Sequence, residues 1–533
     1  MKKLLAVLLT LCLMLSLAAV ADTSILNTEA AYPVVTEPLT LTLVGPKDAS
    51  QGEWKDLKFF QKWQEITGVT LDITTYAEDG WDVNLNLIMS EEKLPDIIYA
   101  GGITAAQEVD WGDDQKALLP LEDLIAEYMP NLSAILEANP VIKASITTPE
   151  GHIYCLPWIN DMPRDLVYGK YWINNSWLEN LGIPEPATVD ELYAALTAFK
   201  EKDANGNGDP DDEIPYSGQK DIKNFYRTVA WWGKAVNDNT LMGTTEDGEV
   251  YYAPLTEEWK KMVTFWANAW ADGLVDPQLF ELDGAGLKAK GQAAGDQTIG
   301  MFQHAGAFLV VPSDQNEDYT IVACLVENEG DTPVWAKTTG LTRGALAITE
   351  SCQYPEVVCR MADWVYEWKE YGGGIYNMRG EAGVDFYYVD ENGEQTEQVK
   401  IDRKFLVLEY TGYDSFEVKR AKVLTANSGS TTPGIGGGTM PQVIYPLNDW
   451  INAEVERQYV PYWRVIYPDV YMSKADTDRA AELKVQLDYA VETWTADFIT
   501  GAKSIDADYD AFIAEIAELG EEYLDIYTRA YGN

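Results

Sequence analysis

Histidine, cysteine and basic residues are all scarce in this chain. It has 2 His and 5 Cys among 533 residues, and 39 Lys+Arg stand against 86 Asp+Glu. His152 and His304 are the two histidines, which excludes a multi-histidine zinc site and leaves little for a Ser-His-Asp triad. The formal net charge of −47 repels nucleic acid and anionic membrane surfaces, so we expect neither as a partner.

Long apolar runs are also missing, except at the N-terminus. Lys2 and Lys3 precede an apolar run over residues 4–17, and the small residues around Val20 stand directly before Asp22. This order predicts a secretory signal peptide, residues 1–21, and an extracytoplasmic product in the periplasm or at the cell surface. An uncleaved anchor is the alternative, but the run is shorter than the roughly 20 residues that a membrane-spanning helix needs.

The few cysteines bear on lipidation and on disulfides. Cys12 lies inside the apolar run and follows Leu11 rather than a small residue, so we expect a product that is not lipidated. Removal of the signal peptide with Cys12 would leave four cysteines. An even number in an oxidising compartment allows disulfides, whereas buried thiols are the commoner outcome in a large domain. The four cysteines in question are Cys155, Cys324, Cys352 and Cys359.

Length and pattern indicate a large α/β protein. A chain of 533 residues with 46% hydrophobic residues is too long for one ordinary domain and can bury more than one core, so two lobes are expected. Strand patterns at 39–44, 71–76 and 96–100 alternate with an amphipathic helix at 54–66, which is typical of an α/β fold.

Gly- and Pro-punctuated segments suggest where the chain passes between lobes. The first crossing is placed at GHIYCLPW, residues 151–158, and the return at TIGMF, residues 298–302. The predicted division, after the signal peptide, is lobe I over 22–155, lobe II over 156–297, a return to lobe I over 298–350, and a mainly helical remainder over 351–533, largely in lobe II. Residues 386–395 read as a hairpin with an Asn392-Gly393 turn.

One loop has the spacing of a calcium-binding loop. Residues 203–215 read DANGNGDPDDEIP, with Asp203, Asn205 and Asn207 at the first, third and fifth positions and Gly208 at the sixth. Alternating oxygen ligands on a glycine turn, closed by a carboxylate cluster at 211–213, suit a hard divalent cation. The sequence therefore predicts a calcium site of structural role at 203–213.

The same loop departs from an EF-hand in two ways. Its twelfth position is Ile214, and the loop occurs once in the chain, so a paired EF-hand sensor is not expected. A solvated Asn/Gly/Asp turn is the alternative. A capping-box pair, Thr188 and Glu191, begins a predicted helix over 189–202 that ends where the loop starts.

The stretch YWINNSWLENLGIPEPATVDELYAALTAFKEKDANGNGDPDDEIP, residues 171–215, resembles the large family 1 extracellular solute-binding proteins, the lipoprotein and alginate-binding branch that serves ABC importers. Residues 151–158, 380–393 and 498–531 are similar to that family as well. The resemblance implies a two-lobed periplasmic-binding-protein-like fold with an interlobe ligand cleft and a helical C-terminal region. It also implies a structural Ca²⁺. The ligands that the resemblance implies are Asp203, Asn205, Asn207, Asp209, Asp212 and Glu213. Because relatives have a loop one residue shorter, the choice among Asp211, Asp212 and Glu213 stays open.

Aromatic residues indicate the ligand class. The chain has 18 Trp and 31 Tyr, and sugar rings stack on such side chains while polar neighbours bond their hydroxyls. Local packing is the alternative for each. The candidates in turn-rich segments near strand ends or crossings are Trp54, Trp158, Trp232 and Trp335, with Asn160, Asp161 and Arg343 as polar companions.

The function that the resemblance implies is binding. Such a protein captures an oligosaccharide, as a monomer, and delivers it to the transmembrane subunits of an ABC importer. Two alternatives stay open: a secreted glycoside hydrolase or polysaccharide lyase, and a calcium-stabilised surface adhesion protein. Because 86 acidic residues make carboxylate pairs inevitable, such pairs are weak evidence for an enzyme. We therefore expect no catalytic residues.

Overall fold

The computed structural model describes most of the chain, and the chain divides into two compact units. Unit 1 comprises Met1–Asn160 and Leu341–Val443, and unit 2 comprises Asp161–Gly340 and Ile444–Asn533. The described residues are 25–49, 51–160, 162–167, 169–293, 297–367, 372–381, 383–385, 387–389, 395–396, 406–408, 421–423, 432–436, 446–468 and 470–532. The expected signal peptide and the candidate Asp161 lie outside them. No helix in the described part of the chain is long and apolar enough to cross a membrane.

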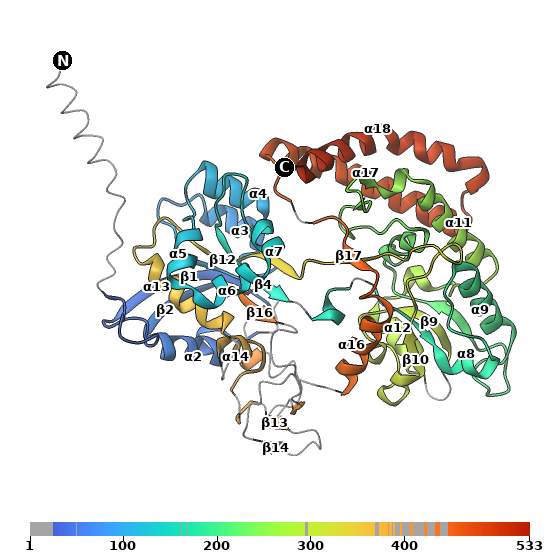
Figure 1. Ribbon diagram of the computed structural model, residues 1–533, viewed down its shortest axis with the longest axis horizontal. Helices are drawn as coiled ribbons and strands as arrows, with labels where there is room; N and C mark the ends of the chain where they lie inside the picture. The colour runs from blue at the N-terminus through green and yellow to red at the C-terminus, as the bar shows by residue number, and fades with distance from the viewer. Residues whose placement is uncertain are drawn as a thin grey trace. The chain divides into compact units, whose positions relative to one another are not determined.

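Unit 1 is built on a six-stranded sheet in the order β16-β4-β12-β3-β1-β2 (Figure 1). β1 pairs in parallel with β2 and β3, whereas β12 runs antiparallel to β3 and β4. The predicted strands at 39–44, 71–76 and 96–100 overlap the observed ones. The strands are β1 (Leu39–Lys47), β2 (Val69–Ala77), β3 (Ile97–Tyr99), β4 (Cys155–Asn160), β12 (Leu341–Ile348) and β16 (Gly434–Gly436).

Helices pack on both faces of this sheet. Leu43 and Tyr99 point into a core shared with α2, α5, α6 and α13, while Val44 and Ile98 pack against α3 on the other face. The expected helix at 54–66 is broken at Leu57. The helices in the described part of unit 1 are η2 (Trp54–Asp56), α2 (Lys58–Thr67), α3 (Trp81–Ile88), α4 (Ala105–Gln107), η3 (Glu108–Asp114, a π-helix), α5 (Glu122–Tyr128), α6 (Pro130–Ala138), α7 (Pro140–Ser145), α13 (Pro355–Asp363), η10 (Trp364–Tyr366) and α14 (Gly373–Arg379).

The hairpin predicted at 386–395 is present in its described parts. β13 (Tyr387–Val389) pairs antiparallel with β14 (Gln395–Thr396) and with β15 (Leu406–Leu408). The Asn392-Gly393 turn itself lies outside the described residues.

Unit 2 contains a four-stranded sheet in the order β10-β5-β9-β6. β5 runs antiparallel to both β9 and β10, and β6 is parallel to β9. Two small pairs complete the strands, β7 with β8 and β11 with β17. Their bounds are β5 (Tyr171–Asn174), β6 (Ile214–Ser217), β7 (Met242–Thr244), β8 (Val250–Tyr252), β9 (Ile299–Gln303), β10 (Tyr319–Ile321), β11 (Trp335–Lys337) and β17 (Trp463–Val465).

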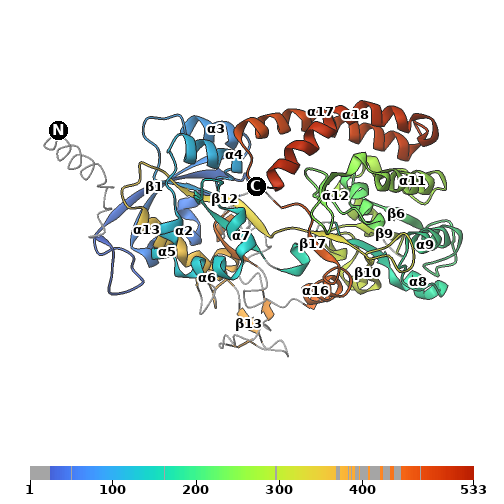
Figure 2. The ribbon, with the colours of Figure 1, turned by 45° about the horizontal axis from the view of Figure 1, so that its top comes forward.

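The C-terminal part of unit 2 is helical, as expected. Figures 1 and 2 show α17 and α18 side by side as a long hairpin, joined by the short turn at Gly501. The helices in the described part of unit 2 are η4 (Pro163–Asp165), α8 (Asn175–Leu181), α9 (Val189–Glu201), α10 (Lys223–Tyr226), η5 (Arg227–Trp232), η6 (Ala253–Leu255), α11 (Glu257–Ala271), η7 (Leu279–Glu281), α12 (Gly284–Gly291), η8 (Ala307–Leu309), η9 (Ser313–Asp318), α16 (Pro446–Gln458), α17 (Lys474–Thr500) and α18 (Ile505–Tyr531).

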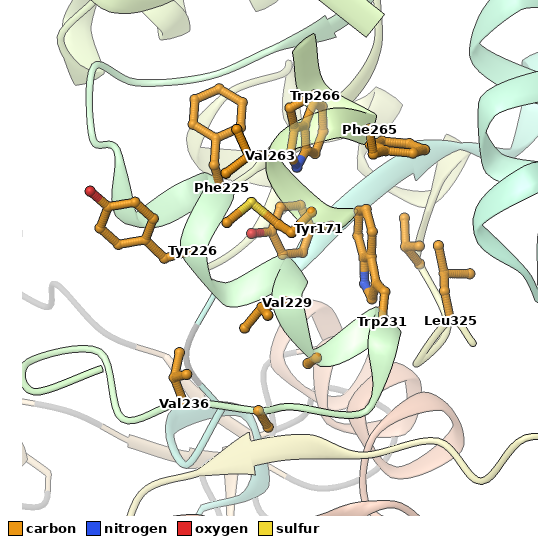
Figure 3. Close-up of a cluster of buried hydrophobic side chains, with 14 of the residues drawn as sticks. Tyr171, Phe225, Tyr226, Val229, Trp231, Val236, Val263, Phe265, Trp266 and Leu325 are labelled. Atoms are coloured by element: carbon orange, nitrogen blue, oxygen red, sulfur yellow. The ribbon is translucent and has the colours of Figure 1, made fainter. Parts of the chain in front are cut away.

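Aromatic side chains fill the core of unit 2. Figure 3 shows Tyr171 of β5 among Trp231, Phe265 and Trp266, and the Trp266 indole donates a hydrogen bond to Thr228 Oγ1 at 2.9 Å. Such clusters bury large apolar areas and favour tilted or edge-on ring pairs. They give a well-packed support to the elements around them.

The observed division corrects the predicted one. The return to unit 1 comes at Leu341, not at 298, and residues 351–443 belong to unit 1. The error arose because TIGMF forms β9, which pairs with β5 and β6 inside unit 2. A short apolar strand does not reveal from its sequence which sheet it joins. The first crossing likewise falls after Asn160 rather than at 155, because β4 completes its pairing in unit 1.

Candidate functional site

The candidate calcium loop connects α9 to β6 in unit 2. The predicted capping box is confirmed, since Thr188 Oγ1 accepts the Glu191 N–H at 3.3 Å and a Glu191 carboxylate oxygen accepts the Thr188 N–H at 3.1 Å. Leu192, Leu196 and Phe199 are buried on the inner face of the helix. α9 therefore holds the start of the loop rigidly against the unit 2 core.

Side-chain oxygens at the odd positions of the loop turn inward. Asp203 Oδ2 accepts the Gly208 N–H at 2.9 Å, Asn205 Oδ1 accepts the Asn207 N–H at 2.9 Å, and Asn207 Oδ1 accepts the Asp209 N–H at 2.7 Å. Gly208 has φ of +93° with nothing within 4 Å of an added Cβ, so backbone conformation, not space, requires glycine there. These hydrogen bonds tie the side chains at the odd positions to the backbone of the loop.

The closing carboxylates fold back onto the start of the loop. Glu213 Oε1 accepts the Ala204 and Asn205 N–H groups at 2.7 and 3.2 Å. Asp212 accepts the side-chain amides of Asn205 at 3.0 Å and Asn207 at 2.8 Å. Of the three acidic residues at 211–213, the geometry thus favours Asp212 and Glu213 as the pair that faces the early positions of the loop.

Two buried carboxylate oxygens in the loop have no hydrogen-bond partner, namely Asp203 Oδ1 and Glu213 Oε2. Burial raises the pKa of the Glu213 carboxyl, and the neighbouring charge of Asp212 raises it further. Leaving such oxygens unsatisfied costs free energy. A divalent cation bound by oxygens alone would satisfy both, so the residues present fit calcium. No group of three or more His, Cys, Asp and Glu side chains that could hold a metal ion is found among the described residues, so an ion in this loop would depend on the amide oxygens of Asn205 and Asn207 as well as on the carboxylates.

Two of the candidate ligand-binding tryptophans are core residues. Trp54 is 1% exposed and stacks on Phe60 with ring centroids 5.2 Å apart. Trp335 is 2% exposed and stacks on Tyr459. This burial corrects the expectation that they face a ligand, because turn-rich flanking sequence does not exclude a buried ring. Local packing accounts for both.

Three other candidates lie together on paired strands of unit 1. Trp158 and Asn160 lie in the second half of β4, and Arg343 is on β12, where the register against β4 shifts between Thr342 and Leu346. Trp158 is mostly buried, and its ring would lie 3.2 Å from a Cβ at Gly434. Asn160 and Arg343 are half-buried. β4 and β12 are inner strands of the sheet, and the pairing of Thr342 with Trp158 places Arg343 next to the position opposite the indole.

Trp232 is the candidate in unit 2 whose ring is partly exposed. It ends η5 and packs beside Trp231 and Phe265, with ring centroids 6.2 and 5.9 Å away. The same helix begins with Arg227, whose guanidinium lies 2.7 Å from Asp238 and donates to Asn224 Oδ1 at 3.0 Å. This buried ion pair holds the start of the helix that ends at Trp232. No local sequence pattern indicates it, because the two partners lie in different elements.

A polar cluster beside Arg343 also escaped prediction. Burial raises the pKa of the Cys155 thiol well above its usual value, the charge of Glu108 raises it further, and that of Arg343 lowers it. Glu108 is a buried carboxylate in the π-helix η3, a local geometry often found at functional sites that no sequence pattern announces. All four cysteines in the described residues are buried free thiols, and no disulfide joins them.

The family model described as bacterial extracellular solute-binding protein matches residues 47–369. The chain belongs to this family.

The chain is similar along most of its length to FusA, the fructooligosaccharide ABC transporter substrate-binding protein of Streptococcus pneumoniae serotype 4. Identity is 30% over 508 residues, covering 92% of this chain and 88% of FusA. The solved structure of S. pneumoniae FusA with kestose has a TM-score of 0.69 at 27% identity, covering 92% of this chain and 99% of that one. An EF-hand mutant of FusA with fructo-nystose gives the same TM-score, identity and coverage.

A more distant structure shows the fold alone. An extracellular solute-binding protein from Bifidobacterium longum subsp. infantis has a TM-score of 0.75 at 17% identity, covering 93% of this chain and 98% of that one. The α/β fold of a two-lobed solute-binding protein with a helical C-terminal region, expected from the sequence, is thereby confirmed.

Proposed function

We propose that this protein captures a neutral oligosaccharide of the fructooligosaccharide class and delivers it to the transmembrane subunits of an ABC importer. The observation that carries the proposal is the similarity to FusA over 92% of the chain. A neutral sugar is preferred because the formal net charge of −47 opposes the approach of an anionic one. The protein acts as a monomer and binds its ligand without chemical change.

Each of the two units carries its own candidates for contact with the ligand. In unit 2, the partly exposed Trp232 offers a face for stacking, supported from behind by Trp231 and by the Arg227–Asp238 pair. In unit 1, Trp158, Asn160 and Arg343 supply an indole and hydrogen-bonding groups on adjoining strands. Such a combination of ring and polar contacts is typical of sugar recognition.

Isothermal titration with kestose tests the proposal, together with chromatography of the sugar afterwards. Binding with kestose recovered intact supports a binding protein, and release of monosaccharide supports a glycoside hydrolase. A shift in melting temperature upon adding kestose gives independent evidence, because a ligand at about 100 times its Kd stabilises the fold by roughly 2.7 kcal/mol. If titration shows no heat, no product forms and the melting temperature does not shift, the adhesion alternative is favoured.

The loop at 203–213 holds a structural calcium ion in this proposal. The side chains that would hold the ion are Asp203, Asn205, Asn207, Asp209, Asp212 and Glu213. The unpartnered oxygens of Asp203 and Glu213 support it, as does the existence of an EF-hand in the similar FusA. The ion would supply positive charge to a loop whose carboxylates otherwise repel one another.

Export follows from the same reading of the N-terminus. We infer that residues 1–21 are removed and that the mature protein begins at Asp22 without a lipid, so that it works outside the cytoplasm. Mass spectrometry of the secreted product tests this. A mature N-terminus of DTSIL is the expected result, and a diacylglycerol-modified cysteine would overturn it.

A further inference from the structure

Gln297 connects the candidate calcium loop to the sheet of unit 2. Asn205 Nδ2 donates to the backbone carbonyl of Gln297 at 3.2 Å, and the Ile214 N–H donates to the carbonyl of Thr298 at 2.8 Å. One contact comes from an early position of the loop and the other from the residue after its last carboxylate. The short segment 297–298 is therefore held from both ends of the loop.

The side chain of Gln297 extends these contacts in two directions. Its Oε1 accepts the Asn174 side-chain amide at 2.5 Å, and its Nε2 donates to Asp318 Oδ2. Both partners lie outside the loop, at the end of β5 and at the end of η9. A single amide thus joins the loop segment to two elements that are far away in sequence.

Both partners then meet at the start of α8. Asn174 is fully buried, and its Oδ1 caps α8 by accepting the Trp177 N–H at 3.1 Å. Asp318 Oδ1 accepts the Ser176 hydroxyl at 3.0 Å. An N-cap of this kind stabilises the helix that it begins, so the orientation of the Asn174 amide matters to α8. Gln297 holds that orientation through the amide nitrogen, which the cap does not use.

Asn205 can serve the loop and Gln297 at once. Its Oδ1 lies on the inside of the turn, while its Nδ2 is shared between Asp212 Oδ1 at 3.0 Å and the Gln297 carbonyl. A cation that draws the Asn205 oxygen inward orients the amide and with it the hydrogen bond to residue 297. Groups that bond the far side of a metal ligand commonly tune both the ligand's orientation and the metal affinity.

We propose that Gln297 is a positioning residue that couples occupancy of the calcium loop to the end of β5 and the start of α8. This inference rests on the proposed calcium site. The coupling predicts that bound calcium slows local unfolding at residues 174–178, which lie outside the loop. It also predicts that this effect depends on the Gln297 side chain.

Hydrogen exchange of the full mature chain, with calcium and with a chelator, tests the coupling. The variant Gln297→Ala keeps the backbone carbonyl that Asn205 uses and removes only the contacts to Asn174 and Asp318. Gln292→Ala, an exposed glutamine after α12, is the matched control. Calcium should slow exchange at residues 174–178 by about tenfold or more in wild type and in the control, and this protection should be lost in Gln297→Ala.

Titration calorimetry with calcium alone separates the possible failures. Calcium should still bind Gln297→Ala, with an affinity about 10- to 100-fold weaker at most. Equal protection of residues 174–178 in wild type and Gln297→Ala would overturn the coupling and leave the calcium site standing. An absence of calcium binding to wild type would overturn the calcium site and the coupling with it. Should Gln297→Ala not fold, Gln297→Glu removes the donor to Asp318 and is expected to show the same loss.

Discussion

Trp335 stacks on Tyr459 with ring centroids 4.9 Å apart and an angle of 5° between the ring planes. Both rings are buried in the unit 2 core, and Tyr171 meets Trp335 edge-on at 6.1 Å. The pair joins β11 to the segment after α16, which are distant in sequence. Trp335 is therefore a structural residue.

Replacement of Trp335 by alanine should destabilise the protein by about 3–5 kcal/mol, because it removes a buried indole and leaves a cavity. Urea unfolding measures the change. Trp463→Ala is the control, since Trp463 lies opposite on the paired strand β17 but is only half-buried, and it should cost less. Wild-type stability with loss of kestose binding in Trp335→Ala would return Trp335 to the ligand candidates.

Trp232→Ala should have the opposite profile. Its ring is partly exposed at the end of η5, so its loss should weaken kestose binding by about 1–3 kcal/mol, or tenfold to hundredfold, with a smaller effect on stability. Salt should change the affinity little if stacking dominates. Titration calorimetry at low and high salt measures both effects.

Trp494→Ala is the matched control for Trp232. Trp494 is also half-buried in unit 2, but on α17, where it donates to Glu515 and lies beneath Lys503. Its replacement should leave kestose binding unchanged. Equal affinities in Trp232→Ala and wild type would show that the ligand lies elsewhere.

Calcium removal should lower the melting temperature without abolishing sugar binding. The two unpartnered oxygens of Asp203 and Glu213 lie in the loop between α9 and β6, and an ion that they bind stabilises the folded state only. Asp203→Ala should reproduce the effect of the chelator and make the melting temperature insensitive to calcium. A wild-type melting temperature that is the same with calcium and with chelator would favour the solvated-turn alternative.

Asp363 should make unit 1 sensitive to pH. Its carboxylate accepts the Leu132 and Asn131 N–H groups at the start of α6, at 3.0 and 3.2 Å. Burial raises its pKa from 3.8 to about 6, against the lowering effect of these hydrogen bonds. Since the folded pKa lies above the unfolded one, the protonated acid stabilises the fold fully below about pH 4. That contribution is lost as the pH rises through about 6.

Asp363→Asn removes this titration, so the unfolding free energy of wild type minus that of the variant should fall by about 2–3 kcal/mol between pH 4 and pH 7. Urea unfolding across that range measures it. The exposed Asp123→Asn, in the first turn of α5, is the matched control for the replacement of an aspartate by asparagine near a helix start. A constant difference for Asp363→Asn would contradict the raised pKa.

Local signals in the sequence predicted local structure well. The capping box of Thr188 and Glu191, the turn in which Asp203 and Asn205 accept backbone N–H groups, and the strands β1 and β2 all follow from neighbouring residues. Each depends on interactions between residues a few positions apart, or on alternation along one strand.

Long-range pairing is what the sequence did not reveal. Trp335 was expected near a ligand because its flanks are rich in turns, but its stacking partner Tyr459 comes more than a hundred positions later. The same limit hid the pairing of β9 with β5, and so the place where the chain returns to unit 1. Contacts of this kind depend on tertiary packing, which overrides local pattern.

The most direct test of the central claim is titration of the purified mature protein with kestose, with the sugar recovered and identified afterwards. The proposal predicts saturable binding and unchanged kestose. Release of free monosaccharide, or an absence of binding to kestose and to every other neutral oligosaccharide in a panel, would contradict it.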